Sequence, residues 1–208
     1  MTKEQIFKII RIIIYSGYLL ALSLVFLHDA RSTEGKFYEN SLTEYFQEGT
    51  FFITVLAYLF CTINYKKTAS LSLLVGGFFL MAFIREFDAV LDAYVYDGAW
   101  QTLVLIVIVF IGYKSFRSRD SLMNQLPHYM ISYPFGLMIG GMLVTFIYSR
   151  LFGETIMWKT VMEENYVRDV KNAVEESVEL LGDSIILFAG LEFIFWAKNN
   201  ESSQSSVS

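Results

Sequence analysis

Six stretches of this chain are mostly apolar and about 20 residues long, the length that an α-helix needs to cross a membrane. No water reaches the hydrocarbon core, so a spanning segment must satisfy its own backbone hydrogen bonds, which a helix does. We therefore predict an all-α fold: a polytopic membrane protein in which six transmembrane helices form a bundle. The predicted spans cover residues 6–28, 42–65, 69–93, 99–116, 127–151 and 177–197.

The composition agrees with a membrane protein. Hydrophobic residues make up 54% of the chain and charged residues 18%, and the mean hydropathy is +0.44, which excludes a disordered chain. The 19 Phe and 13 Tyr suit helices in lipid with aromatic residues at the interfaces. The single cysteine, Cys61, excludes a disulfide framework and a cysteine-based zinc site. Basic residues are too few and too dispersed for nucleic-acid binding.

The lysine and arginine residues give the six spans a direction. Cytoplasmic flanks of membrane helices are enriched in these residues. With the N-terminus inside, the inner flanks hold Lys3, Lys8, Arg11, Lys66, Lys67, Lys114, Arg117, Arg119 and Lys198. We therefore predict a multi-pass protein of the kind found in the bacterial inner membrane, with both termini cytoplasmic.

The spans are predicted to form a single transmembrane domain over residues 1–198. The first apolar stretch is long for a secretion signal and no small-residue cleavage site follows it, so we expect an uncleaved anchor. Between spans five and six, residues 153–176 alternate apolar and charged positions at helical spacing, which predicts an amphipathic helix on the outer interface. Residues 199–208, rich in Ser and Asn, are predicted to be a disordered tail.

Acidic residues concentrate on the predicted outer side. The chain has 21 Asp and Glu residues, and nearly all of them lie on this side of the membrane in the predicted topology. The exceptions are Glu4, Asp120, Glu192 and Glu201. Several lie at i, i+4 spacing on one helix face, where like charges repel. These pairs are Glu44 with Glu48, Asp88 with Asp92, and Glu179 with Asp183. In the predicted topology they share one layer near the outer membrane boundary, together with His28 and Arg85.

Such crowded carboxylates need a compensating charge, and three sources remain open. A bound divalent cation suits a set of hard oxygen ligands with one histidine. Protons are the second source, because crowded or desolvated carboxylates take up protons more readily. A salt-bridge network around Arg85 is the third. The predicted metal ligands are Glu48, Asp88, Asp92, Glu179, Asp183 and His28, and the predicted substrate or proton site is Arg85, Glu86 and Glu192.

Three function classes follow from these compensations. The sequence favours cation- or proton-linked transport of a small solute. A membrane-embedded, metal-dependent enzyme that acts on a lipid or headgroup at the outer leaflet is the first alternative. An accessory subunit whose acids and Arg85 form a structural network is the second. The chain contains no H-E-x-x-H, G-x-S-x-G, P-loop or G-x-G-x-x-G motif, so no catalytic pattern supports the enzyme.

Span five carries a small-residue face. Gly136 and Gly140 are four positions apart, a spacing that lets another helix approach closely. This face predicts helix packing within the chain, or contact with a second copy or a partner membrane protein. At the start of span two, Ser41 and Glu44 form a capping-box pattern, in which the serine hydroxyl accepts a first-turn amide.

Overall fold

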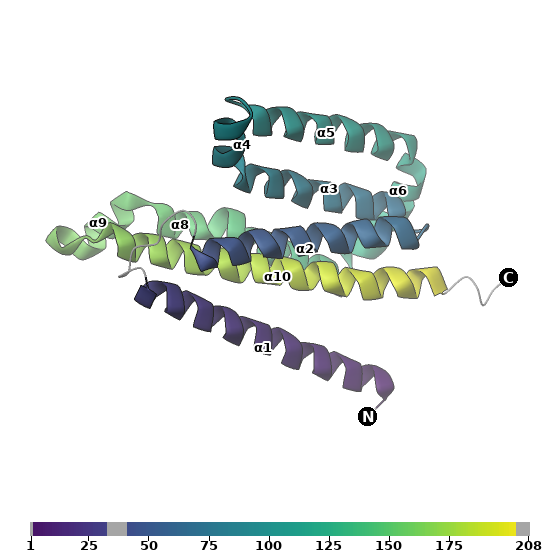
Figure 1. The fold of residues 1–208 in the computed structure, drawn as a ribbon. Coiled ribbons are helices and arrows are strands. Elements are labelled where there is room, and N and C mark those ends of the chain that lie inside the picture. Colours follow the sequence, from purple (N-terminus) through teal and green to yellow (C-terminus); the bar gives the residue numbers. More distant parts are fainter. Residues whose placement is uncertain (1, 33–40, 203–208) are drawn as a thin grey trace. The chain divides into compact units, whose positions relative to one another are not determined.

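The computed structural model describes residues 2–32 and 41–202, and every regular element in these two ranges is helical. The all-α prediction is therefore confirmed. The elements are α1 (Lys3–Ser32), α2 (Leu42–Asn64), α3 (Ala69–Glu86), α4 (Asp88–Tyr94), α5 (Ala99–Arg117), α6 (Arg119–Met130), α7 (Tyr133–Met142), a π-helix (Leu143–Tyr148), α8 (Ser149–Gly153), α9 (Thr155–Met162), a 3₁₀ turn (Glu163–Asn165) and α10 (Arg168–Ser202) (Figure 1).

Six helical segments are long and apolar enough to cross a membrane. They are Gln5–Ser32, Leu42–Asn64, Ala69–Glu86, Ala99–Arg117, Tyr133–Gly153 and Arg168–Ser202. Large apolar side chains on these segments are exposed, as on α1, where Ile13 and Leu20 are each 64% exposed. Exposure of this extent is costly in water and favourable in lipid. The chain is a multi-pass membrane protein, as its sequence predicts.

The third predicted span is shorter than expected. The predicted helix over 69–93 ends at Glu86, and α4 begins at Asp88. Between them, the Phe87 N–H donates to the carbonyl of Ile84, three residues earlier, which tightens the last turn and ends the helix. Arg85 therefore does not share a continuous helix face with Asp88 and Asp92.

The fifth predicted span, 127–151, is interrupted at its start. Helix α6 ends at Met130 and α7 begins at Tyr133. Pro134 accounts for this break, because proline has no N–H and its ring clashes with the carbonyl four residues earlier. In the first turn of α7 the same residue is tolerated, since first-turn amides have no partner within the helix.

The predicted interfacial helix over 153–176 consists of two pieces. Helix α9 ends at Met162, and Glu163 adopts φ 51° and ψ −123°, which stops the helix. The second piece is the beginning of α10, which continues without interruption through the predicted sixth span to Ser202. The first four residues of the predicted tail, 199–202, are helical, and residues 203–208 lie outside the described part of the chain.

The chain divides into two compact units. The first contains Met1–Gln47 and Gly141–Ser184, and the second contains Glu48–Gly140 and Ile185–Ser208. The chain passes between the units inside α2, α7 and α10 rather than in loops.

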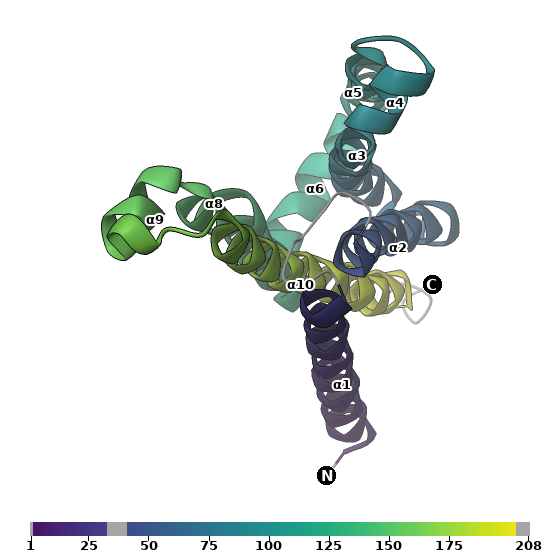
Figure 2. The same ribbon diagram turned by 60° about the vertical axis from the view of Figure 1, so that its left-hand side comes forward.

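The core of the second unit is aromatic. Tyr58 is fully buried and packs with its ring centroid 5.9 Å from that of Phe79 and 4.9 Å from that of Phe193. Helices α3 and α5 lie side by side, joined through α4 (Figure 2). Gly77 makes this packing possible, because a Cβ there would collide with the side chain of Ile111. These contacts bury about one helix face and leave the rest for lipid.

Lys67, in the turn between α2 and α3, holds the C-terminal end of α10. Its ammonium donates to the carbonyls of Asn200 and Glu201 at 2.5 and 3.2 Å, and its N–H donates to the Glu201 carboxylate at 3.2 Å. The last carbonyls of a helix have no partner inside it, and a lysine satisfies them well. This contact explains why α10 extends into the predicted tail.

Candidate polar site in the first unit

The first half of α10 carries four carboxylates on neighbouring positions of one helix side. Glu175, Glu179 and Asp183 are spaced at i, i+4 and i+8, and Glu176 lies beside Glu175. We call these four residues the α10 carboxylate face. It includes Glu179 and Asp183 from the predicted metal site. The π-helix and the first residue of α8, which belong to the same unit, contact Asp183 and Glu179 of this face.

Asp183 is the most deeply buried of the four, at 2% exposed. Its Oδ1 accepts a hydrogen bond from the Thr145 hydroxyl at 2.9 Å. Gly182 allows this approach, since a Cβ at that position would collide with the Thr145 side chain and lie 2.7 Å from its backbone nitrogen. The glycine thus sets the distance at which α10 and the π-helix pack.

Ser149 extends the hydrogen-bonded series. Its hydroxyl lies 2.5 Å from the Thr145 carbonyl oxygen and 3.2 Å from Glu179 Oε1. With one proton, it can donate fully to only one of them at a time. We call Thr145, Ser149, Glu179 and Asp183 the polar seam. It places two hydroxyls, two carboxylates and one backbone carbonyl between two membrane-spanning segments.

The backbone of the π-helix contributes to this arrangement. The N–H of Ser149 donates to the carbonyl of Val144, five residues earlier instead of four. Such wider turns are rare, and they are found frequently at functional sites. In this segment, the Thr145 and Ser149 side chains face α10, where they contact Asp183 and Glu179.

Two cations contact the α10 carboxylate face. The Arg150 guanidinium lies 3.9 Å from Glu175 and 3.7 Å from Glu179, and Lys171 lies 2.9 Å from Glu175. Glu176 has no ion pair with any residue in the described ranges. Its electrostatic neighbours are carboxylates: Glu44, Glu179, Glu175 and Asp29. The carboxylates of this region are therefore crowded around Glu176, and burial together with this crowding disfavours its charged form unless a cation compensates it.

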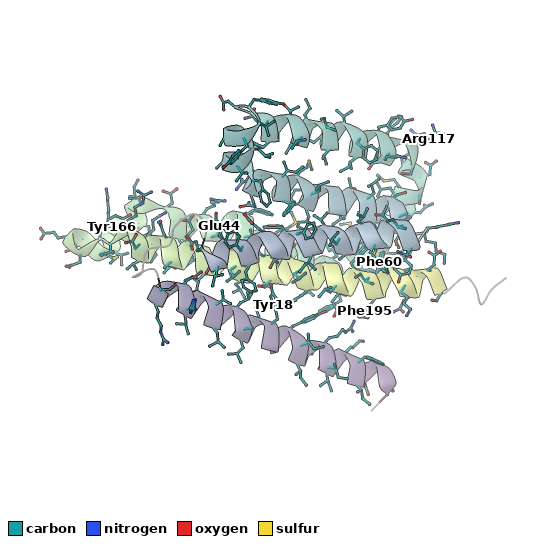
Figure 3. The ribbon with its side chains drawn as sticks, viewed as in Figure 1. Tyr18, Glu44, Phe60, Arg117, Tyr166 and Phe195 are labelled. Carbon is teal, nitrogen blue, oxygen red and sulfur yellow. The ribbon has the colours of Figure 1, made fainter. Side chains whose placement is uncertain are left out.

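Asp29 connects the end of α1 to the start of α2. Its Oδ2 accepts hydrogen bonds from the Thr43 N–H at 2.7 Å and from the Thr43 hydroxyl at 2.8 Å. Ser41 accepts the Glu44 N–H at 3.1 Å, which confirms the predicted serine cap. Glu44 thus lies in the first turn of α2 (Figure 3). A negative charge is favourable there, because the helix N-terminus carries partial positive charge.

The other predicted site residues are divided between the units. His28 belongs to the first unit, where it is exposed near the end of α1. The second unit contains Glu48, Arg85, Glu86, Asp88, Asp92 and Glu192.

In the second unit, the predicted residues make local contacts. The Arg85 guanidinium lies 4.0 Å from Glu86, and both side chains are substantially exposed. Asp88 accepts the N–H of Ala89 at 2.5 Å, and Asp92 accepts the N–H of Gly98 at 3.0 Å. Glu192 is 6% exposed within α10. The two aspartates therefore stabilise the backbone around α4.

The structure brings no three His, Cys, Asp or Glu residues of its described ranges into an arrangement that could hold a metal ion. A divalent metal centre remains a prediction from sequence.

Sequence reasoning missed the residues that pair with the α10 carboxylates. Thr145 and Ser149 are four apart in span five, a spacing that places two hydroxyls on one face of a helix. That signal is weak, because hydroxyls in membrane helices commonly bond their own backbone. Arg150, at the end of the same span, is the stronger missed signal, since a cation there can reach carboxylates on a neighbouring helix.

No protein-family model, no curated protein and no solved structure matches this chain.

Proposed function

We propose that this protein carries out cation- or proton-linked transport of a small solute, with the polar seam as its cation or proton site. The observation that carries the proposal is a buried carboxylate, Asp183, inside a membrane-spanning helix. It accepts a hydrogen bond from the Thr145 hydroxyl. Ionisable groups in such helices are costly, and in membrane proteins they mark ion pathways and proton relays.

The chemistry of the polar seam suits small cations. Carboxylate, hydroxyl and carbonyl oxygens are hard ligands for ions such as Na⁺, and the same carboxylates can accept protons. Ser149 lies within hydrogen-bond distance of both the Thr145 carbonyl and Glu179, so its proton can change partner as the charge of Glu179 changes. A local change of charge would then alter hydrogen bonds along the π-helix.

The distribution of basic residues indicates which side of the membrane the polar seam faces. We propose that both termini are cytoplasmic and that the beginning of α10 faces the outside, in a bacterial inner membrane or an equivalent one. In this orientation the α10 carboxylate face opens outward and attracts cations. Gly136 and Gly140 support contact with a second copy, because a Cβ at either would meet no atom of the described residues within 4 Å.

The ion pairs of the α10 carboxylate face support the alternative function, an accessory subunit. Arg150 lies between Glu175 and Glu179, and Lys171 pairs with Glu175, so these charges can serve to hold helices together. A purely structural network predicts that cations in solution have no effect on the carboxylates of the polar seam.

Labelling with a hydrophobic carbodiimide separates these functions. This reagent reacts with a carboxyl group that has taken up a proton, and a bound cation protects the group. We expect label on Asp183 or Glu179, located by mass spectrometry, with an extent that changes with pH or falls when Na⁺ replaces an inert organic cation. The Asp183→Asn variant identifies the label on Asp183. Labelling that is the same at pH 6 and pH 8, with and without Na⁺, would favour the structural network.

A further inference from the structure

The first unit contains an apolar groove between α1 and the first half of α10. It has a volume of about 470 Å³, within the range of small-molecule sites. Leu19, Leu22 and Phe26 line it from α1, and Ser177, Leu180 and Leu181 line it from α10. Its surface is mostly apolar, so it suits a hydrophobic body rather than a hydrated ion.

One end of this groove is strongly acidic. On α10, Ser177 lines the groove and the preceding residue is Glu176; on α1, Phe26 lines it three residues before Asp29. Each carboxylate lies within three positions of a lining residue, and the two are close enough to interact electrostatically, which indicates that both lie near the same end of the groove. Glu44 is also close enough to interact electrostatically with Glu176.

The charges are not equally available to a ligand. Asp29 is 3% exposed and accepts two hydrogen bonds from Thr43, so its charge already has donors. Glu176 is more exposed, and within the described ranges it forms no ion pair. A cation at the end of the groove would therefore interact mainly with Glu176.

We propose that this groove binds a lipophilic cation, a molecule with one positive charge and a bulky apolar body. The apolar body occupies the space between α1 and α10, and the positive charge lies beside Glu176. In the low-polarity surroundings of a membrane helix, this complementarity selects a cation over an anion of equal shape.

This inference rests on the proposed function for its biological role, since it makes the lipophilic cation the transported solute. Both ligand and coupling ion would then use neighbouring parts of α10: the groove at Ser177 and Leu181, and the polar seam at Glu179 and Asp183. Binding itself does not depend on transport and can be measured separately.

Equilibrium dialysis of the purified full-length protein in detergent tests the binding, with tetraphenylphosphonium as the probe and protein-free detergent as the blank. We expect saturable binding by the wild type and no saturable binding of tetraphenylborate, which has the same shape and the opposite charge. The Glu176→Gln variant should bind tetraphenylphosphonium about tenfold more weakly, because it removes the carboxylate nearest the proposed position of the cation. Leu181→Trp should abolish binding by filling the groove.

Two matched variants control for indirect effects. Glu164→Gln removes a carboxylate from the 3₁₀ turn before α10, and Leu24→Trp adds a ring to a 60% exposed position of α1 that does not line the groove. Both should bind the probe as the wild type does.

Several results would overturn the proposal. They are wild-type affinity in Glu176→Gln, wild-type affinity in Leu181→Trp, equal binding of the two tetraphenyl ions, or no saturable binding of tetraphenylphosphonium at all. If Glu176→Gln does not fold, Leu181→Trp alone decides, because Leu181 is 44% exposed and tolerates a larger side chain. The two proposals can fail separately. If carbodiimide labelling of Glu179 and Asp183 does not depend on cations or pH, but the probe binds normally, the transport function is contradicted and the proposal of a binding groove is supported.

Discussion

At the scale of single residues, the candidate ion site depends on how Asp183 is stabilised. Its burial would be costly for a charge without partners, and the Thr145 hydroxyl provides one of its hydrogen bonds. Thr145 is itself buried, at 6% exposed, so water cannot replace its hydroxyl easily. The pair therefore links the stability of the protein to the charge of its candidate ion site.

We predict that Thr145→Val lowers the free energy of unfolding by about 1–3 kcal/mol, because a buried acceptor loses a donor while the side-chain volume hardly changes. Thermal unfolding in detergent measures the effect. Thr160→Val is the matched control, since the Thr160 hydroxyl is exposed and, among the described residues, bonds only the carbonyl of Ile156 in its own helix. Equal melting temperatures for the two variants would contradict the role given to Thr145.

At the scale of helices, close approach of α10 to the π-helix requires Gly182. At its C-terminal end, α10 contacts the turn between α2 and α3, where the Lys67 N–H donates a hydrogen bond to the Glu201 carboxylate. These two contacts lie in different units, so each can be tested without disturbing the other.

Gly182→Ala is predicted to destabilise the protein by about 1–3 kcal/mol, because its methyl group would overlap Thr145 and push the π-helix away. Gly112→Ala in α5 should be neutral or slightly stabilising, since a Cβ there meets no described atom within 4 Å and alanine favours a helix. Denaturation of both variants checks the difference. A Gly182→Ala protein as stable as Gly112→Ala would show that the two segments are not in close contact.

Lys67→Met should loosen the last turn of α10. A lysine at a helix C-terminus contributes about 0.3–1 kcal/mol, so we expect amide exchange in residues 199–202 to become about two- to fivefold faster. Hydrogen exchange read by mass spectrometry makes the measurement. The neighbouring Lys66→Met variant, which removes an exposed lysine, should leave the exchange unchanged, and faster exchange in both variants would point to a general charge effect.

At the scale of the whole molecule, hydropathy predicts the six spans because the bilayer imposes one length and one kind of surface on all of them. It does not predict where the spans break. Phe87 ends α3 through a single backbone bond, and the π-helix depends on one extra residue that leaves the apolar pattern intact.

The candidate site was predicted only in part, for a related reason. Glu179 and Asp183 stood out because charge is rare in an apolar segment. Their partners Thr145, Ser149 and Arg150 come from a segment about 30 to 40 positions earlier, and no local pattern in one sequence shows which spans are neighbours. The grouping of Glu179 and Asp183 with Glu48, Asp88 and Asp92 stays a prediction.

The most direct test of the central claim is the current that follows a rapid change of ion concentration over proteoliposomes on a solid-supported membrane. We predict that a Na⁺ jump or a pH jump moves charge in the wild type, and that Asp183→Asn abolishes this signal while Glu164→Gln retains it. A current in Asp183→Asn equal to that of the wild type would contradict the claim, as would a wild-type current no larger than that of protein-free liposomes.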